Sequence, residues 1–180
     1  WYQIGTVPEA EKLLLQAIEK FKQSGDDDPA GVLTAQELLA SIYTDSGRFT
    51  EAETSLKSVL EARRKLKGER DPETLTTFSN LASVYQKAGN WEQARVMFEQ
   101  LAKQREAQLG PNHEDTLTSL NNLASSLGKL GQHEQAASIL ERVLRGQRES
   151  VGEDHPRTIM TMGSLATYYD SIGESEKGIA

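Results

Sequence analysis

One glycine recurs at a fixed interval along the chain. Gly5, Gly47, Gly89, Gly131 and Gly173 each stand 42 residues after the one before. A constant period of this length is typical of stacked helical units, in which each unit contacts its neighbours and together they bury a continuous core. Chains of this kind usually work by presenting a surface. The period therefore predicts both the fold class and the kind of function.

Other positions keep the same interval and show what one unit contains. A leucine-alanine pair precedes the glycine by seven to eight residues, and an alanine follows it by five in the first four units. The apolar residues before Gly89 recur at i, i+3, i+4 and i+7, and those after it recur at i, i+3, i+7 and i+10. Each spacing is that of one helix face. Glycine permits the chain to reverse between the two helices. Each unit is predicted to be a helical hairpin with a helix A and a helix B, and the two apolar stripes around Gly89 are Phe78, Leu81, Ala82 and Tyr85, then Trp91, Ala94, Phe98 and Leu101.

A second recurring glycine, represented by Gly68, Gly110 and Gly152, marks the end of helix B. The basic stretch from Glu61 to Arg70 precedes one of these ends, and we interpret it as a solvated helix end whose cations complement the helix dipole. Asp71 and Pro72 have the residue types of an N-cap and a first helical residue. Helix A is then predicted to be about 16 residues long and helix B about 20, or roughly 24 and 30 Å.

The predicted fold class is all-α, a solenoid of antiparallel helical hairpins. We expect one elongated array over residues 1–180. It comprises a partial unit at 1–28, mainly helix B, units at 29–70, 71–112 and 113–154, and a partial unit at 155–180 with helix A and its turn. Both ends fall inside a unit, so the chain is expected to be a piece of a longer array whose uncapped ends offer a route to self-association.

These residues resemble the tetratricopeptide repeat, whose pattern has Leu, a small residue and Tyr on helix A, then Ala and Phe on helix B. The 42-residue period, the linker around His155-Pro156 and the run from Asn121 to Ala124 are similar to the kinesin-light-chain type of that repeat. The resemblance implies a right-handed superhelix in which helices A line the concave wall. It also implies an intracellular, cytoplasmic protein-binding scaffold.

Composition narrows the range of partners. The formal net charge of −7 argues against nucleic acid and against anionic membranes, because their phosphates attract basic surfaces. The chain has no cysteine, which excludes disulfides and thiolate metal sites and fits a reducing compartment. No apolar run is long enough to span a membrane.

Residues with catalytic or metal-binding chemistry are few. His113 and His155 stand in equivalent loops next to helix starts and are expected to play a structural part near the N-cap, while His133 is expected to substitute for an aromatic residue in packing. The acidic run Asp26-Asp27-Asp28 lacks the later glycine and glutamate of an EF-hand, so we interpret it as a loop that caps the next helix. We therefore predict no enzyme activity, no cofactor and no metal.

The candidate binding surface is the side of helix A opposite its core stripe. This side is polar and rich in amides, and Asn side chains can both donate to and accept from the backbone of an extended peptide. A carboxylate clamp is not expected, because Glu37, Ser79, Asn121 and Gly163 stand where chaperone-binding arrays carry lysine. The predicted peptide-binding residues are Glu37, Ser41, Thr76, Ser79, Asn80, Ser83, Lys87, Thr118, Asn121, Asn122, Ser125 and Lys129.

Three functions remain as alternatives. The first is a non-catalytic interaction scaffold that binds a peptide or a partner domain in the groove of the A helices. The second is a C-terminal sensor, autoinhibitory or self-assembly segment of a larger signalling NTPase. The third, a helical enzyme, needs a convergent polar pocket, and the repeat pattern predicts none.

Overall fold

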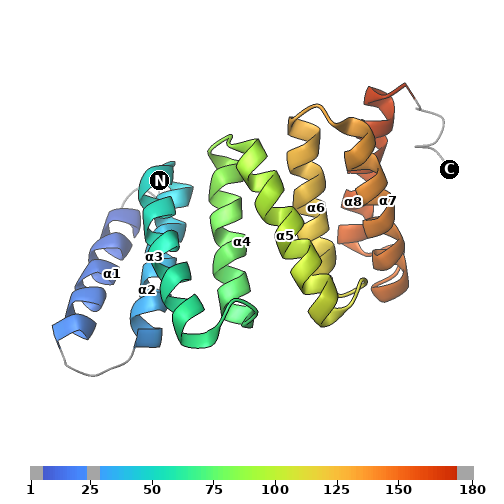
Figure 1. Cartoon of the computed structure of the whole chain (residues 1–180). Helices are drawn as coiled ribbons and strands as arrows, with labels where there is room; N and C mark the ends of the chain where they lie inside the picture. The colour runs from blue at the N-terminus through green and yellow to red at the C-terminus, as the bar shows by residue number, and fades with distance from the viewer. Residues whose placement is uncertain (1–5, 24–28, 174–180) are drawn as a thin grey trace. The chain divides into compact units, whose positions relative to one another are not determined.

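The computed structural model describes residues 6–23 and 29–173. Over these ranges the secondary structure is entirely helical, which confirms the predicted fold class. The chain divides into two compact structural units, each larger than a single repeat. From here on, unit 1 means residues 1–89 and unit 2 means residues 90–180. Unit 1 holds the helices α1 (Thr6–Gln23), α2 (Pro29–Asp45), α3 (Phe49–Lys67) and α4 (Pro72–Lys87), and unit 2 holds α5 (Trp91–Leu109), α6 (Glu114–Lys129), α7 (His133–Ser150) and α8 (Pro156–Ser171) (Figure 1).

Helices A are α2, α4, α6 and α8, and helices B are α1, α3, α5 and α7. In unit 1, α2 packs against α1 and α3, and α3 packs against α4; in unit 2, α6 packs between α5 and α7, and α7 packs against α8 (Figure 1). The observed A helices are 16 or 17 residues long and the B helices 18 or 19. These lengths agree with the expected ones.

The turn between helix A and helix B has the hydrogen bonds of a Schellman motif. Gly47 has a φ of 75°, which a residue with a side chain adopts only at a cost. The Arg48 N–H donates to the carbonyl of Tyr43 at 2.8 Å, and the Gly47 N–H donates to that of Thr44 at 3.2 Å. The recurring glycine therefore ends each A helix because the left-handed conformation closes its last turn.

The helix starts are capped by side chains. Asp71 Oδ1 accepts from the N–H groups of Glu73 at 3.0 Å and Thr74 at 3.3 Å, as predicted for an N-cap. His113 Nδ1 accepts from the Asp115 N–H at 3.1 Å, and His155 Nδ1 accepts from the Arg157 N–H at 3.2 Å. Both histidines thus have the structural role expected of them.

The alanine columns are buried between packed A and B helices. Ala124 of α6 and Ala136 of α7 are both 0% exposed. Enlarging Ala124 to leucine is expected to overpack this contact and to lower the free energy of unfolding by about 1–3 kcal/mol. Urea unfolding followed by circular dichroism measures the loss, with Asn121→Leu on the exposed side of α6 as control. A variant A124L as stable as its parent would show that the column is assigned to the wrong face.

Candidate functional site

In unit 1 five of the predicted binding residues line one hollow between two A helices. The hollow has a volume of about 180 Å³. Residues from α2 and α4 form its two sides, and Leu56 of α3 also lines it. We call it the polar hollow, and it is lined by Glu37, Ser41, Thr44, Asp45, Leu56, Asn80, Ser83, Val84 and Lys87.

Five of the twelve predicted residues line this hollow: Glu37, Ser41, Asn80, Ser83 and Lys87. Thr76 is exposed and Ser79 half-buried on the same helix, α4, outside the lining. Sequence periodicity therefore placed the α2 and α4 residues on a common side. It did not reveal that Lys87 and Glu37 already form ion pairs with other side chains of this unit.

An ion pair joins the two sides of the polar hollow. Lys87 Nζ lies 2.9 Å from Asp45 Oδ1, and more than half of each side chain is exposed. An exposed pair of this kind contributes about 0–1 kcal/mol. A ligand group that accepts hydrogen bonds can therefore replace Asp45 at Lys87 at little cost.

The Glu37 carboxylate forms an ion pair with a buried arginine. Arg63 of α3 is 5% exposed, and its Nη2 lies 2.8 Å from Glu37 Oε2. Arg63 Nη1 also donates to Thr77 Oγ1 at 2.8 Å and to the Glu73 carbonyl at 3.0 Å. This network joins α2, α3 and α4 beneath the hollow, so the Glu37 carboxylate already has structural partners.

The interpretation of the basic stretch from Glu61 to Arg70 as a solvated helix end is wrong for Arg63. Its equivalent in unit 2, Arg105, is also buried and donates to Ser119 Oγ at 2.9 Å and to the Asp115 carbonyl at 3.2 Å. Burial lowers the pKa of the Arg105 guanidinium from its ordinary value, and the Asp115 carboxylate acts in the opposite direction. The two arginines stand 42 residues apart and therefore occupy the same position of the repeat. This interval is the feature of the sequence that indicated a buried role for both.

In unit 2 the predicted residues lie on α6. Thr118, Asn121 and Lys129 are exposed, while Asn122 and Ser125 are half-buried. Lys129 Nζ lies 5.9 Å from the centre of the Trp91 ring, within range of a cation–π contact. This face is therefore available to a ligand, but its lysine rests on an aromatic ring.

The part of unit 2 that corresponds to the polar hollow of unit 1 differs from it because it contains a tyrosine. Gly128 and Tyr168 stand where unit 1 has Thr44 and Val84. The Tyr168 ring fills the space beside Gly128, where a Cβ would lie 2.1 Å from the tyrosine hydroxyl. Burial raises the pKa of Tyr168 above its ordinary value. The sequence columns did not predict this substitution, because Tyr168 departs from the residue types before it.

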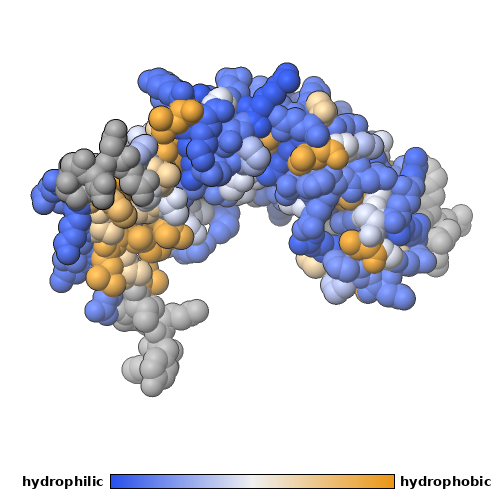
Figure 2. All heavy atoms as spheres, turned by 90° about the horizontal axis from the view of Figure 1, so that it is seen from below, coloured by the Kyte–Doolittle hydropathy of each residue, from blue (hydrophilic) through white to orange (hydrophobic). Residues whose placement is uncertain are grey.

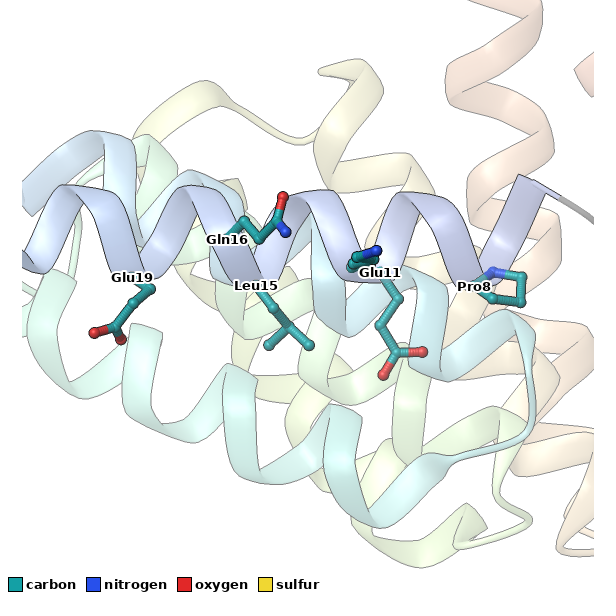
Figure 3. Close-up of a pocket in the computed structure, with 6 residues that line it drawn as sticks. Pro8, Glu11, Leu15, Gln16 and Glu19 are labelled. Atoms are coloured by element: carbon teal, nitrogen blue, oxygen red, sulfur yellow. The ribbon is translucent and has the colours of Figure 1, made fainter.

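A second hollow, of about 410 Å³, lies on α1 alone. Figure 3 shows Glu11, Leu15 and Glu19 directed to the same side of this helix. Its polar groups do not converge on a point, so it has no evident chemistry.

Metal and membrane sites receive no support from the described part of the chain. Residues 6–23 and 29–173 bring together no group of three His, Cys, Asp or Glu side chains suited to a metal ion. The acidic run Asp26-Asp27-Asp28 lies outside the described residues. Within the same ranges every helix is too short or too polar to cross a lipid bilayer.

The pattern of the family described as tetratricopeptide repeat matches residues 31–107, 73–149 and 123–177. These matches span most of the sequence, so the chain belongs to the tetratricopeptide repeat family. Repeats of this family commonly serve as protein-interaction scaffolds and are typically non-catalytic. A search of curated proteins found no match.

Solved structures give the same result for the fold. A Podosopora anserina protein, described under the name kinesin light chain with nearly identical TPR-like repeats, is 28% identical, with a TM-score of 0.81 over 98% of this chain and 83% of that one. BtubC (BKLC) from P. vanneervenii has a TM-score of 0.85 at 20% identity over 98% of this chain and 70% of that one. MamA has a TM-score of 0.63 at 15% identity, covering 91% and 80%. The last two show similarity of fold alone.

Proposed function

We propose that this chain is a non-catalytic scaffold that binds an extended segment of a partner protein along its A helices. The observation that carries the proposal is the polar hollow of unit 1, where residues of α2 and α4 meet around Asn80. The family to which the chain belongs supports a scaffold role. A cytoplasmic location is part of the same proposal and fits the absence of cysteine from the sequence.

The chemistry of the hollow favours the ligand's main chain over a charged end group. The Glu37 carboxylate forms an ion pair with Arg63, and Lys87 forms one with Asp45. The charged side chains of the hollow therefore largely neutralise one another. The Asn80 side chain is exposed beside them and can both donate and accept hydrogen bonds. Hydroxyls and amides of this kind match the N–H and C=O groups of an extended peptide.

The hollow also has an apolar neighbour. Leu38 of α2 occupies the column of Asn80 and Asn122, and 54% of its surface is exposed. A ligand side chain that covers Leu38 removes apolar surface from water, which is favourable at about 25 cal/mol per Å². The proposed ligand is therefore an extended peptide with an apolar residue near this position.

Peptides selected from a displayed library against the whole chain test the proposal. Asn80→Ala and Lys87→Ala are expected to weaken a selected peptide by about ten-fold, which corresponds to roughly 1.4 kcal/mol of lost contact. Asn121→Ala and Asn122→Ala test the α6 face in the same titration. The affinity is measured by isothermal titration calorimetry.

The control for this titration is Lys65→Ala on α3. Lys65 is an exposed lysine of a B helix, 73% exposed at its side chain, and its removal is expected to leave the affinity unchanged. Unchanged affinity in N80A, K87A, N121A and N122A for every selected peptide would exclude the A-helix faces as the binding surface.

A further inference from the structure

The residues that line the polar hollow have counterparts in unit 2. Helices α6 and α8 stand two 42-residue intervals after α2 and α4 in the sequence. Two lining residues, Thr44 of α2 and Val84 of α4, correspond there to Gly128 and Tyr168. A pair of small side chains on the two sides of the hollow has thus become a glycine on one side and a large aromatic residue on the other.

The tyrosine ring spans the distance between α8 and α6. A Cβ at Gly128 would lie within 3.0 Å of the hydroxyl oxygen, Cε1 and Cζ of Tyr168, which is closer than side-chain atoms approach one another. Tyr168 stands on α8, and these outer atoms of its ring lie against α6. The ring therefore crosses the part of unit 2 that corresponds to the polar hollow.

A hydrogen bond changes its donor together with this exchange. In unit 1 the Thr44 hydroxyl donates to the Ala40 carbonyl at 2.7 Å, one turn earlier on α2. Ala124 stands at the position of Ala40 in unit 2, and its carbonyl accepts from the Tyr168 hydroxyl at 3.4 Å. The donor is thus a residue of α8 in place of one on the same helix. The glycine and the tyrosine therefore act as one pair, because the ring takes both the space and the hydrogen-bonding role of the missing side chain.

Helix α7 supports the ring from another side. The ring centre of His133, at the start of α7, lies 5.8 Å from that of Tyr168, with 33° between the two planes, which is within the range of aromatic contacts. The exposure of the neighbouring serines agrees with a cover over this position. Ser41 beside the polar hollow is exposed, whereas its counterpart Ser125 in unit 2 is half-buried.

We propose that Tyr168 is a specificity-determining residue that closes the unit 2 counterpart of the polar hollow, so that a bound segment inserts a bulky side chain into unit 1 alone. This inference rests on the proposed function and adds to it which part of the ligand is selected. A pocket that protein atoms fill rejects a bulky ligand side chain, whereas an open pocket of matching size accepts it. Unit 2 is then left to contact the main chain and small side chains of the ligand.

Thiol labelling of the whole chain tests the closure without any ligand. The sequence contains no cysteine, so Ser41→Cys and Ser125→Cys each introduce a single reporter at matching positions of the two units. With N-phenylmaleimide as the probe, S125C is expected to react about ten-fold more slowly than S41C, because reaction at a covered site waits for local opening. Tyr168→Val, which introduces the residue type of Val84, is expected to remove that difference. Tyr168→Phe is expected to keep it, since the ring covers the site.

Two controls separate opening of this position from unfolding of the chain. Ser126 follows the reporter in the sequence and is 0% exposed, so Ser126→Cys is expected to remain protected in a folded Y168V chain. Met160 of the same helix as the tyrosine is 73% exposed, and Met160→Val is expected to leave the labelling of S125C unchanged. Equal labelling of S125C in the presence of Tyr168 and of valine would overturn the closure.

The reciprocal exchange tests the closure in unit 1, where Tyr168 itself is not altered. Thr44→Gly combined with Val84→Tyr transfers the pair to the polar hollow and is expected to slow the labelling of S41C by about ten-fold. This variant decides the question if Y168V loses its fold. Unchanged labelling of S41C in folded T44G/V84Y would contradict the inference.

A peptide selected on the parent chain from the displayed library tests the effect on specificity. Alanine replacement along this peptide is expected to identify one bulky side chain whose loss weakens binding by about ten-fold. T44G/V84Y is expected to weaken the unreplaced peptide by a similar factor and to make that side chain irrelevant. A library selected on Y168V is expected to show a second preferred bulky residue, because the opened part of unit 2 can accept it.

The competing position for an apolar ligand side chain is the surface of α1. Figure 2 shows hydrophobic residues gathered at the α1 end of unit 1, and Leu13 of this helix is 60% exposed. Leu13→Ser is expected to leave the affinity of the selected peptide unchanged. Weaker binding to L13S together with unchanged binding to T44G/V84Y would place the side chain on α1 and would overturn the inference.

The inference and the proposed function fail on different results. Protected S125C in Y168V, or the same preferred residues in libraries selected on the parent chain and on Y168V, would remove the role of Tyr168 and leave peptide binding intact. Unchanged affinity in all four asparagine and lysine variants of the proposed titration would remove the binding surface itself, and the specificity role with it, even where labelling shows that the ring closes its position.

Discussion

Replacing Arg63 with alanine is expected to lower the free energy of unfolding by about 3 kcal/mol. Arg63 is 5% exposed and bonds to Glu37, Thr77 and the Glu73 carbonyl. Removing one partner of a buried ion pair leaves the other charge without compensation, which typically costs about 3–5 kcal/mol. The lower end applies because the Glu37 side chain retains 15% exposure. Urea unfolding followed by circular dichroism measures the loss.

The neighbouring arginine is the matched control for this variant. The Arg64 side chain is 39% exposed, and its Nε lies 3.9 Å from Glu69 Oε1, so Arg64→Ala is expected to change stability by less than about 0.5 kcal/mol. The double variant R63M/E37Q removes both charges and is expected to recover part of the loss. Equal stability of R63A and R64A would contradict the structural role assigned to the buried arginine.

Truncating Phe98 to alanine is expected to lower the free energy of unfolding by about 3–5 kcal/mol. Phe98 of α5 is 0% exposed, so its removal takes apolar contacts from the core and leaves a cavity that the surrounding helices fill only in part. Urea unfolding is the measurement here as well.

The repeat itself supplies the control for Phe98. Leu56 and Leu140 occupy the same column and are 2% and 1% exposed. Phe98→Leu is therefore expected to cost less than about 1.5 kcal/mol, since the column accepts leucine elsewhere. If F98A and F98L lost the same stability, the position would not be part of a well-packed core.

The fold could be predicted from the sequence because the residues that determine it act on neighbours close to them in the chain. The glycine period predicts the turns because the turn bonds are local. The Gly47 N–H donates to the carbonyl three residues back, and the Arg48 N–H donates to the one five residues back. Caps such as Asp71 act within three residues of themselves. Helix periodicity then separated the buried side of each helix from the exposed one, and this is why Asn80 and Lys87 were placed correctly on the outer side of α4.

The site was accessible only in part, because its remaining features depend on contacts between distant residues. Arg63 meets Glu37 across 26 residues and Thr77 across 14. Lys and Arg residues near a helix end are typical of a solvated terminus. Only the packing of neighbouring helices shows that one of them, Arg63, is buried. Tyr168 fills the groove position of unit 2 because Gly128, forty residues earlier in the chain, has no side chain. The helical period alone does not show that pairing.

The most direct test of the account is to map a selected peptide onto the whole chain by NMR, with backbone amides as probes. The account predicts that the largest chemical-shift changes fall on α2 and α4 around Ser41, Asn80, Ser83 and Lys87, with a second group on α6. Changes confined to the outer sides of the B helices, with these amides unmoved, would contradict it.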